Sequence, residues 1–177
     1  MNLPDVIETE RLTLRSLRPS DAGPITLYAG DRRVAEMLTS VPHPYPPGAA
    51  EQFIASALNG RLGEQVWALD ATKIDGPEFI GTIGMKRRTP PELGYWVGPP
   101  FWRTGYASEA AQAVVAAVMA AGAPSITALV FAENEASASV LLSAGFHETG
   151  AAEDFSVARG GKVAVRRFAL EFAAAGA

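Results

Sequence analysis

The chain lacks the residues on which several common kinds of site depend. Its 177 residues include no cysteine and only two histidines, His43 and His147. Without cysteine there are no disulfides, no thiol catalysis and few ways to build a zinc site. Two histidines are also too few for a histidine-rich metal site. The composition therefore predicts a protein that works without a metal.

Basic runs and long apolar runs are missing as well. The net charge is −4, and no cluster of lysine and arginine marks a surface for nucleic acid. No apolar run is long enough to cross a bilayer, and the N-terminus has no apolar signal region. We therefore expect a cytoplasmic protein that engages neither nucleic acid nor membrane. The length predicts a single domain, 1–177, with its core at about residues 7–172.

The most informative stretch, residues 92–119, predicts a strand, a tight loop and a helix. Apolar residues alternate over 93–97, as in a strand, and Gly-Pro-Pro at 98–100 prevents further pairing. From Ser108 the apolar residues recur with helical spacing. The loop thus delivers backbone amides at about 103–107 to a helix start, which attracts anions. A phosphate-bearing ligand is the first expectation.

The remaining elements are read from periodicity, caps and breakers. Further helices are expected from Ser20 as an N-cap, at 31–38, at 49–58, and at 135–144 between Asn134 as N-cap and Gly145. Further strands are expected at 12–17, 66–71, 78–88, 125–131, 146–150 with 154–158, and 163–172, and residues 173–177 are expected to fray. This is an α+β fold with a mixed sheet of about seven strands and four to five helices.

Several motifs, taken in order, resemble a known family. They are Glu-Arg-Leu-Thr-Leu-Arg at 10–15, Pro-Tyr-Pro at 44–46, Glu-Leu-Gly-Tyr-Trp-Val at 92–97, Phe-Trp-Arg-Thr-Gly-Tyr-Ala-Ser-Glu-Ala at 101–110, and Asn-Glu-Ala-Ser at 134–137 before Gly-Phe at 145–146. Together they resemble the GNAT superfamily of N-acetyltransferases, and most closely its ribosomal-protein N-terminal (alanine/serine) acetyltransferase branch. The resemblance spans roughly residues 7–172. It implies a mostly antiparallel sheet that splays open at a cofactor cleft.

The resemblance implies acetyl-CoA as the co-substrate and assigns the residues that hold it. The pyrophosphate would lie on the backbone amides of Arg103, Thr104, Gly105, Tyr106 and Ala107. The pantetheine arm would bond to the backbone of the central strand around Trp96, Val97 and Gly98. Arg103 replaces a glycine that is usual in the family's loop. The replacement either weakens the tight turn or places a guanidinium beside the phosphates.

By the same resemblance, the reaction is acetyl transfer to a primary amine by direct attack in a ternary complex. The amine must lose a proton, and a lysine side chain needs a base more than an α-amine does, because its pKa is higher. Glu92 is the first candidate base, and Glu78 or a water is the alternative. Glu92 could also be a plain carboxylate at a strand end. Glu109 is not expected to be the base, since it sits in the first turn of the phosphate-facing helix.

The leaving thiolate needs a hydrogen-bonding partner. Many family members use a tyrosine seven residues after the asparagine of the later helix, but this position is Leu141. Ser137 is the expected replacement, with Asn134 bonding the pantetheine or a bridging water. The plain alternative is that Asn134 caps the helix and Ser137 returns a bond to it. His147 is expected to face outward on a strand, and the three tryptophans to line the core or the cleft.

Acceptor recognition is the least legible part of the sequence. His43 and Tyr45 lie in a proline-rich loop that, by the resemblance, covers the acceptor end of the cleft, and simple loop packing is the alternative. The acceptor could be a protein or peptide N-terminus or a small-molecule amine. A different class of function, a catalytically silent CoA-binding regulatory or interaction protein, stays open at this point, as does a homodimer.

Overall fold

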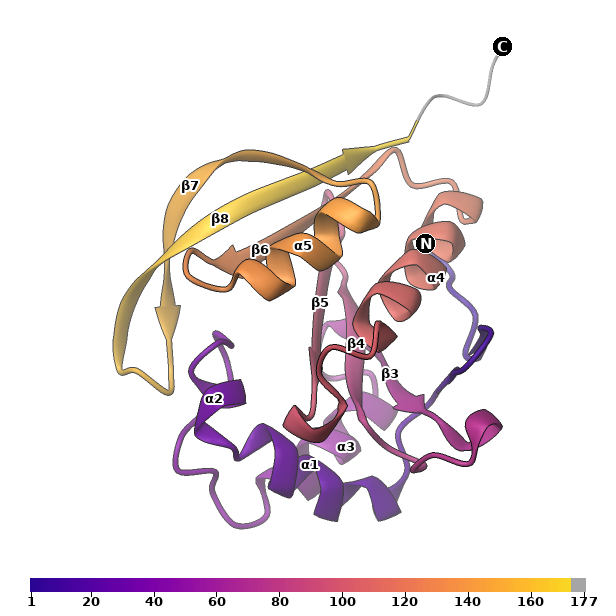
Figure 1. The fold of residues 1–177 in the computed structure, drawn as a ribbon, viewed down its shortest axis with the longest axis vertical. Coiled ribbons are helices and arrows are strands. Elements are labelled where there is room, and N and C mark those ends of the chain that lie inside the picture. The colour runs from indigo at the N-terminus through magenta and orange to yellow at the C-terminus, as the bar shows by residue number, and fades with distance from the viewer. Residues whose placement is uncertain (173–177) are drawn as a thin grey trace.

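The computed structural model describes residues 1–172, and its strands form one sheet in the order β1-β2-β3-β4-β5-β6-β8-β7 (Figure 1). The strands are β1 (Ile7–Glu8), β2 (Thr13–Arg15), β3 (Glu64–Asp70), β4 (Gly81–Lys86), β5 (Glu92–Val97), β6 (Ser125–Phe131), β7 (His147–Ser156) and β8 (Gly161–Glu171). All neighbours are antiparallel except β5 and β6. The predicted mixed, mostly antiparallel sheet is confirmed, with eight strands in the described residues rather than about seven.

Helices cover both faces of the sheet (Figure 1). They are α1 (Ala22–Ala29), α2 (Arg32–Ala35), α3 (Ala49–Leu58), α4 (Tyr106–Ala120) and α5 (Glu135–Ser143). Apolar residues of α4 and α5 pack with Leu93 and Val97 of β5 in one core, and those of α1 and α3 pack with Ala68 and Trp96 in a second core. Within residues 1–172, no helix has the length and apolar character that crossing a membrane requires.

The two cores divide the side chains of β5 between them. Successive residues of a strand point to opposite faces, so Leu93, Tyr95 and Val97 share the α4/α5 face. Glu92, Gly94 and Trp96 share the α1/α3 face. The groups discussed below for the acetyl donor lie on the α4/α5 face, and those discussed for the amine acceptor lie on the α1/α3 face.

Several predicted elements agree with the structure. The helix at 49–58, the strand at 125–131 and the strand that begins at Glu92 have the predicted bounds. Asn134 caps α5 as predicted, because its side-chain oxygen accepts from the Ser137 amide. Gly122 and Gly145 follow α4 and α5 with φ of +80° and +94°, the left-handed conformation that favours glycine.

Other boundaries were predicted wrongly, and the tertiary contacts explain two of them. The strand predicted at 78–88 is shorter, because the Glu78 carbonyl accepts from the buried Arg15 guanidinium instead of pairing in the sheet. Ser20 does not cap α1, which starts after a 3₁₀ turn at Pro19–Asp21. The carboxylate of Asp21 in this turn binds Arg15.

The remaining differences are shifts of a few residues. The strand predicted at 12–17 spans only Thr13–Arg15, the one predicted at 66–71 starts earlier, at Glu64, and α2 is shorter than 31–38. Helix α4 begins at Tyr106, two residues before the predicted start. The two segments predicted at 146–150 and 154–158 are one strand, β7, with an irregularity between Glu148 and Gly150. The predicted fraying of 173–177 lies outside the described residues.

The parallel pair β5 and β6 separates part-way along its length. Pairing joins Glu92 to Thr127 and Leu93 to Ala128, and it goes no further. Both strands nevertheless continue, β5 to Val97 and β6 to Phe131. The sheet therefore opens between their carboxyl-terminal halves, which confirms the predicted splay.

Candidate active site

The backbone of β5 presents hydrogen-bonding groups to this gap. Leu93 faces β6 in the paired part, so Tyr95 and Val97 face the gap by alternation. The Val97 carbonyl accepts from Trp102 Nε1 at 2.7 Å. Trp96 instead pairs with Thr82 of β4, and both backbone groups of Gly98 are used, by Ile80 and Phe101. Of the three residues expected to bond pantetheine, only Val97 has backbone groups that face the gap, and Trp96 and Gly98 do not. Tyr95, which was not predicted, also faces the gap.

The loop after β5 places a helix start beside the gap. The first helical bond runs from the Glu109 amide to the Gly105 carbonyl at 3.0 Å, so the amides of Tyr106, Ala107 and Ser108 have no partner within the helix. Gly105 has a φ of +82°. Thr104 Oγ1 donates to the Phe101 carbonyl at 2.6 Å and closes the loop. The helix start on which the predicted anion site depends is thus present, and Ser108 adds a third amide to it.

Arg103 has a left-handed backbone conformation, which favours glycine. Its φ is +62°, in the left-handed region where a non-glycine residue costs about 1–2 kcal/mol. The turn therefore forms despite the replacement. The side chain of Arg103 is exposed next to the helix start.

Arg11 reaches the same helix start from the segment between β1 and β2. Its Nε donates to Glu109 Oε2 at 2.7 Å and its Nη1 to the Thr104 carbonyl at 2.8 Å. The guanidinium also lies over the Tyr106 ring, 4.6 Å from its centroid. Sequence reasoning missed Arg11, although it belongs to the opening motif, because nothing local indicates partners almost a hundred residues away.

Glu109 is held by that arginine rather than free to act as a base. Besides Arg11, Thr9 Oγ1 donates to its carboxylate at 2.6 Å. Burial alone would raise the pKa of Glu109, but the bonds from Thr9 and Arg11 outweigh it and lower the pKa. Its position in the first turn of α4 agrees with the prediction.

Across the gap, Tyr95 meets Ser137 of α5. The tyrosine hydroxyl lies 2.9 Å from both the carbonyl oxygen and Oγ of Ser137. Burial raises the pKa of Tyr95 to about 12, against the opposite effect of its bond to Ser137. The phenol therefore stays protonated at neutral pH and is a hydrogen-bond donor rather than a source of protons.

This contact bears on whether Ser137 returns a bond to Asn134. Its Oγ bonds Tyr95 and does not return a bond to Asn134, although the Asn134 side chain does cap the helix at 3.1 Å. If the phenol donates to Oγ, the serine proton is left free for another acceptor. Leu141, at the family's tyrosine position, is fully buried in the core. The tyrosine that contacts Ser137 thus comes from β5 and not from α5.

The candidate bases differ in surroundings. Glu92 is 6% exposed, and its carboxylate pairs with Lys86 Nζ at 2.5 Å and Arg88 Nη1 at 2.8 Å. Glu78 is exposed in the loop before β4. Lys86 and Arg88 thus engage both oxygens of the Glu92 carboxylate.

The proline-rich loop packs on the end of α1. His43 Nδ1 lies 3.1 Å from the Gly30 carbonyl, and Tyr45 is half-buried against the second core. Burial raises the pKa of Tyr45, and the nearby Glu51 adds to the effect. Loop packing is what these contacts show, and a role of His43 and Tyr45 in acceptor binding stays a prediction. His147 is exposed on β7, as expected.

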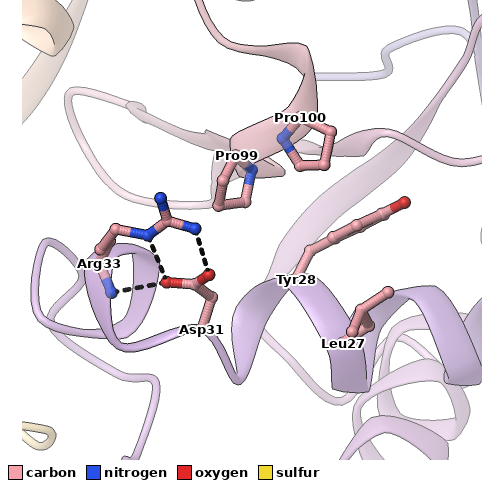
Figure 2. Close-up of a pocket in the computed structure, with 6 residues that line it drawn as sticks. All are labelled: Leu27, Tyr28, Asp31, Arg33, Pro99 and Pro100. Atoms are coloured by element: carbon pink, nitrogen blue, oxygen red, sulfur yellow. Dashed lines mark hydrogen bonds and ion pairs between the residues drawn. The ribbon is translucent and has the colours of Figure 1, made fainter.

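A hollow of about 390 Å³ lies between α1, α2 and the turn after β5 (Figure 2). It is lined by Leu27, Tyr28, Asp31, Arg33, Pro99 and Pro100. Figure 2 shows Arg33 forked onto Asp31, with a bond of 2.7 Å from Nη2. The Tyr28 ring lies against Gly98, where a Cβ would come within 2.8 Å of it. The hollow thus borders the turn at Gly98 that follows β5.

Comparison with known proteins decides the family. The model of the acetyltransferase (GNAT) domain matches residues 11–147. The chain belongs to the GNAT family. It is 31% identical over 169 residues to the uncharacterized N-acetyltransferase YoaA of Bacillus subtilis (strain 168), covering 88% of this chain and 90% of that protein. This GNAT protein is an acetyl-CoA-dependent acetyltransferase.

Solved structures agree in fold. RimJ of Mycobacterium smegmatis, in complex with CoA-disulfide, has a TM-score of 0.79 at 20% identity and covers 95% of this chain and 88% of its own. The microcin C7 self immunity acetyltransferase MccE, in complex with acetyl-CoA and AMP, has a TM-score of 0.77 at 14% identity and covers 92% and 93%. At these identities the likeness shows the fold alone.

Proposed function

We propose that this protein transfers the acetyl group of acetyl-CoA to a primary amine by direct attack within a ternary complex. The observation that carries the proposal is the gap between β5 and β6, which has a helix start at one end and the Tyr95–Ser137 pair across it. Tyr95 and Val97 offer backbone groups to pantetheine along the gap. The amides of Tyr106, Ala107 and Ser108 suit the pyrophosphate.

Arg11 adds a charge to the phosphate site. A Cβ built on Gly105 would lie 3.2 Å from its Nη2, so this nitrogen borders the start of α4. A guanidinium forms stronger hydrogen bonds to phosphate oxygens than neutral donors do. Arg11 is therefore assigned to the cofactor together with Arg103, Thr104 and Gly105 of the loop.

At the reacting end, Ser137 is assigned to the leaving thiolate and Asn134 to the pantetheine or a water. The Tyr95 hydroxyl bonds both the carbonyl oxygen and Oγ of Ser137 and so fixes the serine beside the gap. Tyr95 acts through Ser137 and is a positioning residue. The relative YoaA is named an N-acetyltransferase, which supports an amine acceptor and does not choose among peptide and small-molecule amines.

Titration calorimetry with acetyl-CoA, followed by thiol release on a panel of amines, tests this function. The panel holds a peptide with a free N-terminus, a lysine peptide with a blocked N-terminus, a polyamine and an aminoglycoside. We expect micromolar to millimolar binding and thiol release with at least one amine. Binding without release on the whole panel would instead favour the silent regulator.

The Ser137→Ala variant tests the thiolate assignment. We expect kcat to fall about 10–100-fold, with little change in the Kd of acetyl-CoA, because the hydroxyl acts after the cofactor is bound. Ser139→Ala, on the same helix with its hydroxyl bonded to the Glu135 carbonyl, is the matched control and should keep full activity. Equal losses in kcat and affinity for Ser137→Ala would assign the serine to binding.

A further inference from the structure

Two paired glycines carry no side chain on the α1/α3 face of the sheet, close to the gap. Gly84 of β4 pairs directly with Gly94 of β5. A Cβ built on Gly94 would meet no atom within 4 Å, so the space above it is open. Gly94 follows Leu93, the last residue of β5 that pairs with β6. The open space therefore adjoins the place where the sheet splays.

The side chain of Glu64 in β3 lies above Gly84 on this face. In the sheet register, Glu64 pairs with Lys86, and Lys86 pairs with Glu92, so the three side chains share one face with the glycines. Glu64 Oε2 lies 3.2 Å from the position of a Cβ on Gly84. Directly paired residues are about 4.5–5.5 Å apart, so the space above Gly94 is within reach of the carboxylate through one water.

The cations near Glu64 bind another carboxylate. Lys86 and Arg88 both bind Glu92. Within residues 1–172, no hydrogen bond or ion pair engages the side chain of Glu64. Burial raises its pKa, which Glu92 supports and Lys86 and Arg88 oppose. A carboxylate with a raised pKa holds a proton more readily than an ordinary one, which suits a general base.

We propose that Glu64 is the general base of the transfer and that Gly84 and Gly94 form the floor across which the amine approaches. The inference rests on the proposed function and names a residue that the sequence did not. A protonated amine gives one proton to Glu64, directly or through a water. Its nitrogen then attacks the thioester carbon, so a C–N bond forms and the C–S bond breaks. The second proton of the nitrogen goes to the departing thiolate, and CoA leaves as the thiol.

The accepted proton has a route out. Glu64 also lines a cavity of about 290 Å³ at the outer edge of β3, together with Leu17, Leu58 and other residues. The charged residues of this cavity are Asp5 and Arg87. Lys86, Arg88 and Glu92 also act on the carboxylate of Glu64, and the end of α3 contributes Ala57 and Leu58 to the lining. Glu64 can thus pass its proton to solvent after each turnover.

The pH dependence follows from the direction of the pKa shift. Below its raised pKa, Glu64 is protonated and cannot accept a proton, so kcat/KM should fall as the pH falls through that value. The ionisation of the amine produces a separate limb at higher pH, near 8 for an α-amine and above 10 for a lysine. Two amines of different pKa therefore tell the limbs apart, since the Glu64 limb does not move with the amine.

The test compares Glu64→Gln with Glu92→Gln. For Glu64→Gln we expect kcat/KM to fall about 10²–10⁴-fold and the acid limb to vanish, while the Kd of acetyl-CoA changes less than twofold. Glu92→Gln should keep the limb. An acid limb that persists in Glu64→Gln, or that vanishes only in Glu92→Gln, would overturn the assignment while leaving the proposed function intact. A wild-type protein that releases no thiol with any amine would defeat the proposed function itself.

A second pair of variants tests the floor. Gly94→Ala fills the open space without a clash and should raise the KM of the amine at least about tenfold, while acetyl-CoA binds as before. Gly23→Ala is the matched control, because a Cβ there also meets no atom within 4 Å, far from the gap in α1. An unchanged KM in a folded Gly94→Ala variant would show that the amine does not approach across this face.

Discussion

Arg11 and Arg15 come from one motif and both bind carboxylates from distant parts of the chain, yet they do different work. All five N–H groups of Arg15 are used, by Asp21, Asp70 and the carbonyls of Ser16 and Glu78. Its side chain is 5% exposed. Arg11 spends its bonds on Glu109 and Thr104, is 33% exposed, and keeps Nη2 beside the start of α4.

The difference teaches how to separate a structural arginine from a binding one. A guanidinium with every donor satisfied inside the protein has nothing left for a ligand, and it ties β2, β3 and the turn before α1 together. A guanidinium with spare donors at a helix start adds charge where an anion is expected. The surroundings of the two residues, and not their motif, assign the roles.

Removing Arg15 should have the largest effect. We expect Arg15→Met to lower the free energy of unfolding by about 3–5 kcal/mol, because it leaves Asp21 and Asp70 buried without their cation. Chemical denaturation measures the loss. Arg32→Met, which breaks an exposed pair with Glu36, is the control and should leave the free energy of unfolding nearly unchanged. A folded Arg15→Met protein of normal stability that binds acetyl-CoA poorly would reverse the comparison.

Removing Arg11 should act on binding more than on stability. We expect Arg11→Met to raise the Kd of acetyl-CoA about tenfold, a change of about 1.4 kcal/mol, because a charged donor to phosphate is lost. Calorimetry with acetyl-CoA measures this change. The matched ligand is S-acetylpantetheine without its phosphates, whose affinity should not change. Equal weakening for both ligands would show that Arg11 only supports the loop.

Arg103 should show the smallest effect and extends the comparison to a third arginine. Arg103→Gly relieves the left-handed strain but makes the unfolded chain more flexible, so we expect a net stabilisation of at most about 1 kcal/mol. Arg103→Ala removes the same charge and keeps the strain. If the two variants bind acetyl-CoA equally and within threefold of wild type, Arg103 contributes little to the phosphate site. A tenfold loss of acetyl-CoA affinity in both variants would show that Arg103, like Arg11, contributes its charge to the phosphate site.

The sequence went furthest where short-range patterns decide the structure. The alternation of β5, the cap at Asn134 and the stop at Gly145 depend on neighbours within a few residues, so each could be predicted directly from the sequence. Motif order gave the family and the phosphate loop. Boundaries failed at Ser20 and Glu78, because the Arg15 guanidinium binds the Asp21 carboxylate and the Glu78 carbonyl and overrides the local preference.

What the sequence by itself determined is the family and the order of the elements, and from the family it predicted the residues that hold acetyl-CoA. Only the tertiary structure decided which polar groups meet: Arg11 with Glu109, Tyr95 with Ser137, and Glu64 with the floor at Gly84. The physical reason is that these contacts depend on strand register and on how helices seat on the sheet. Both are properties of residues far apart in the chain, and local composition carries no record of them.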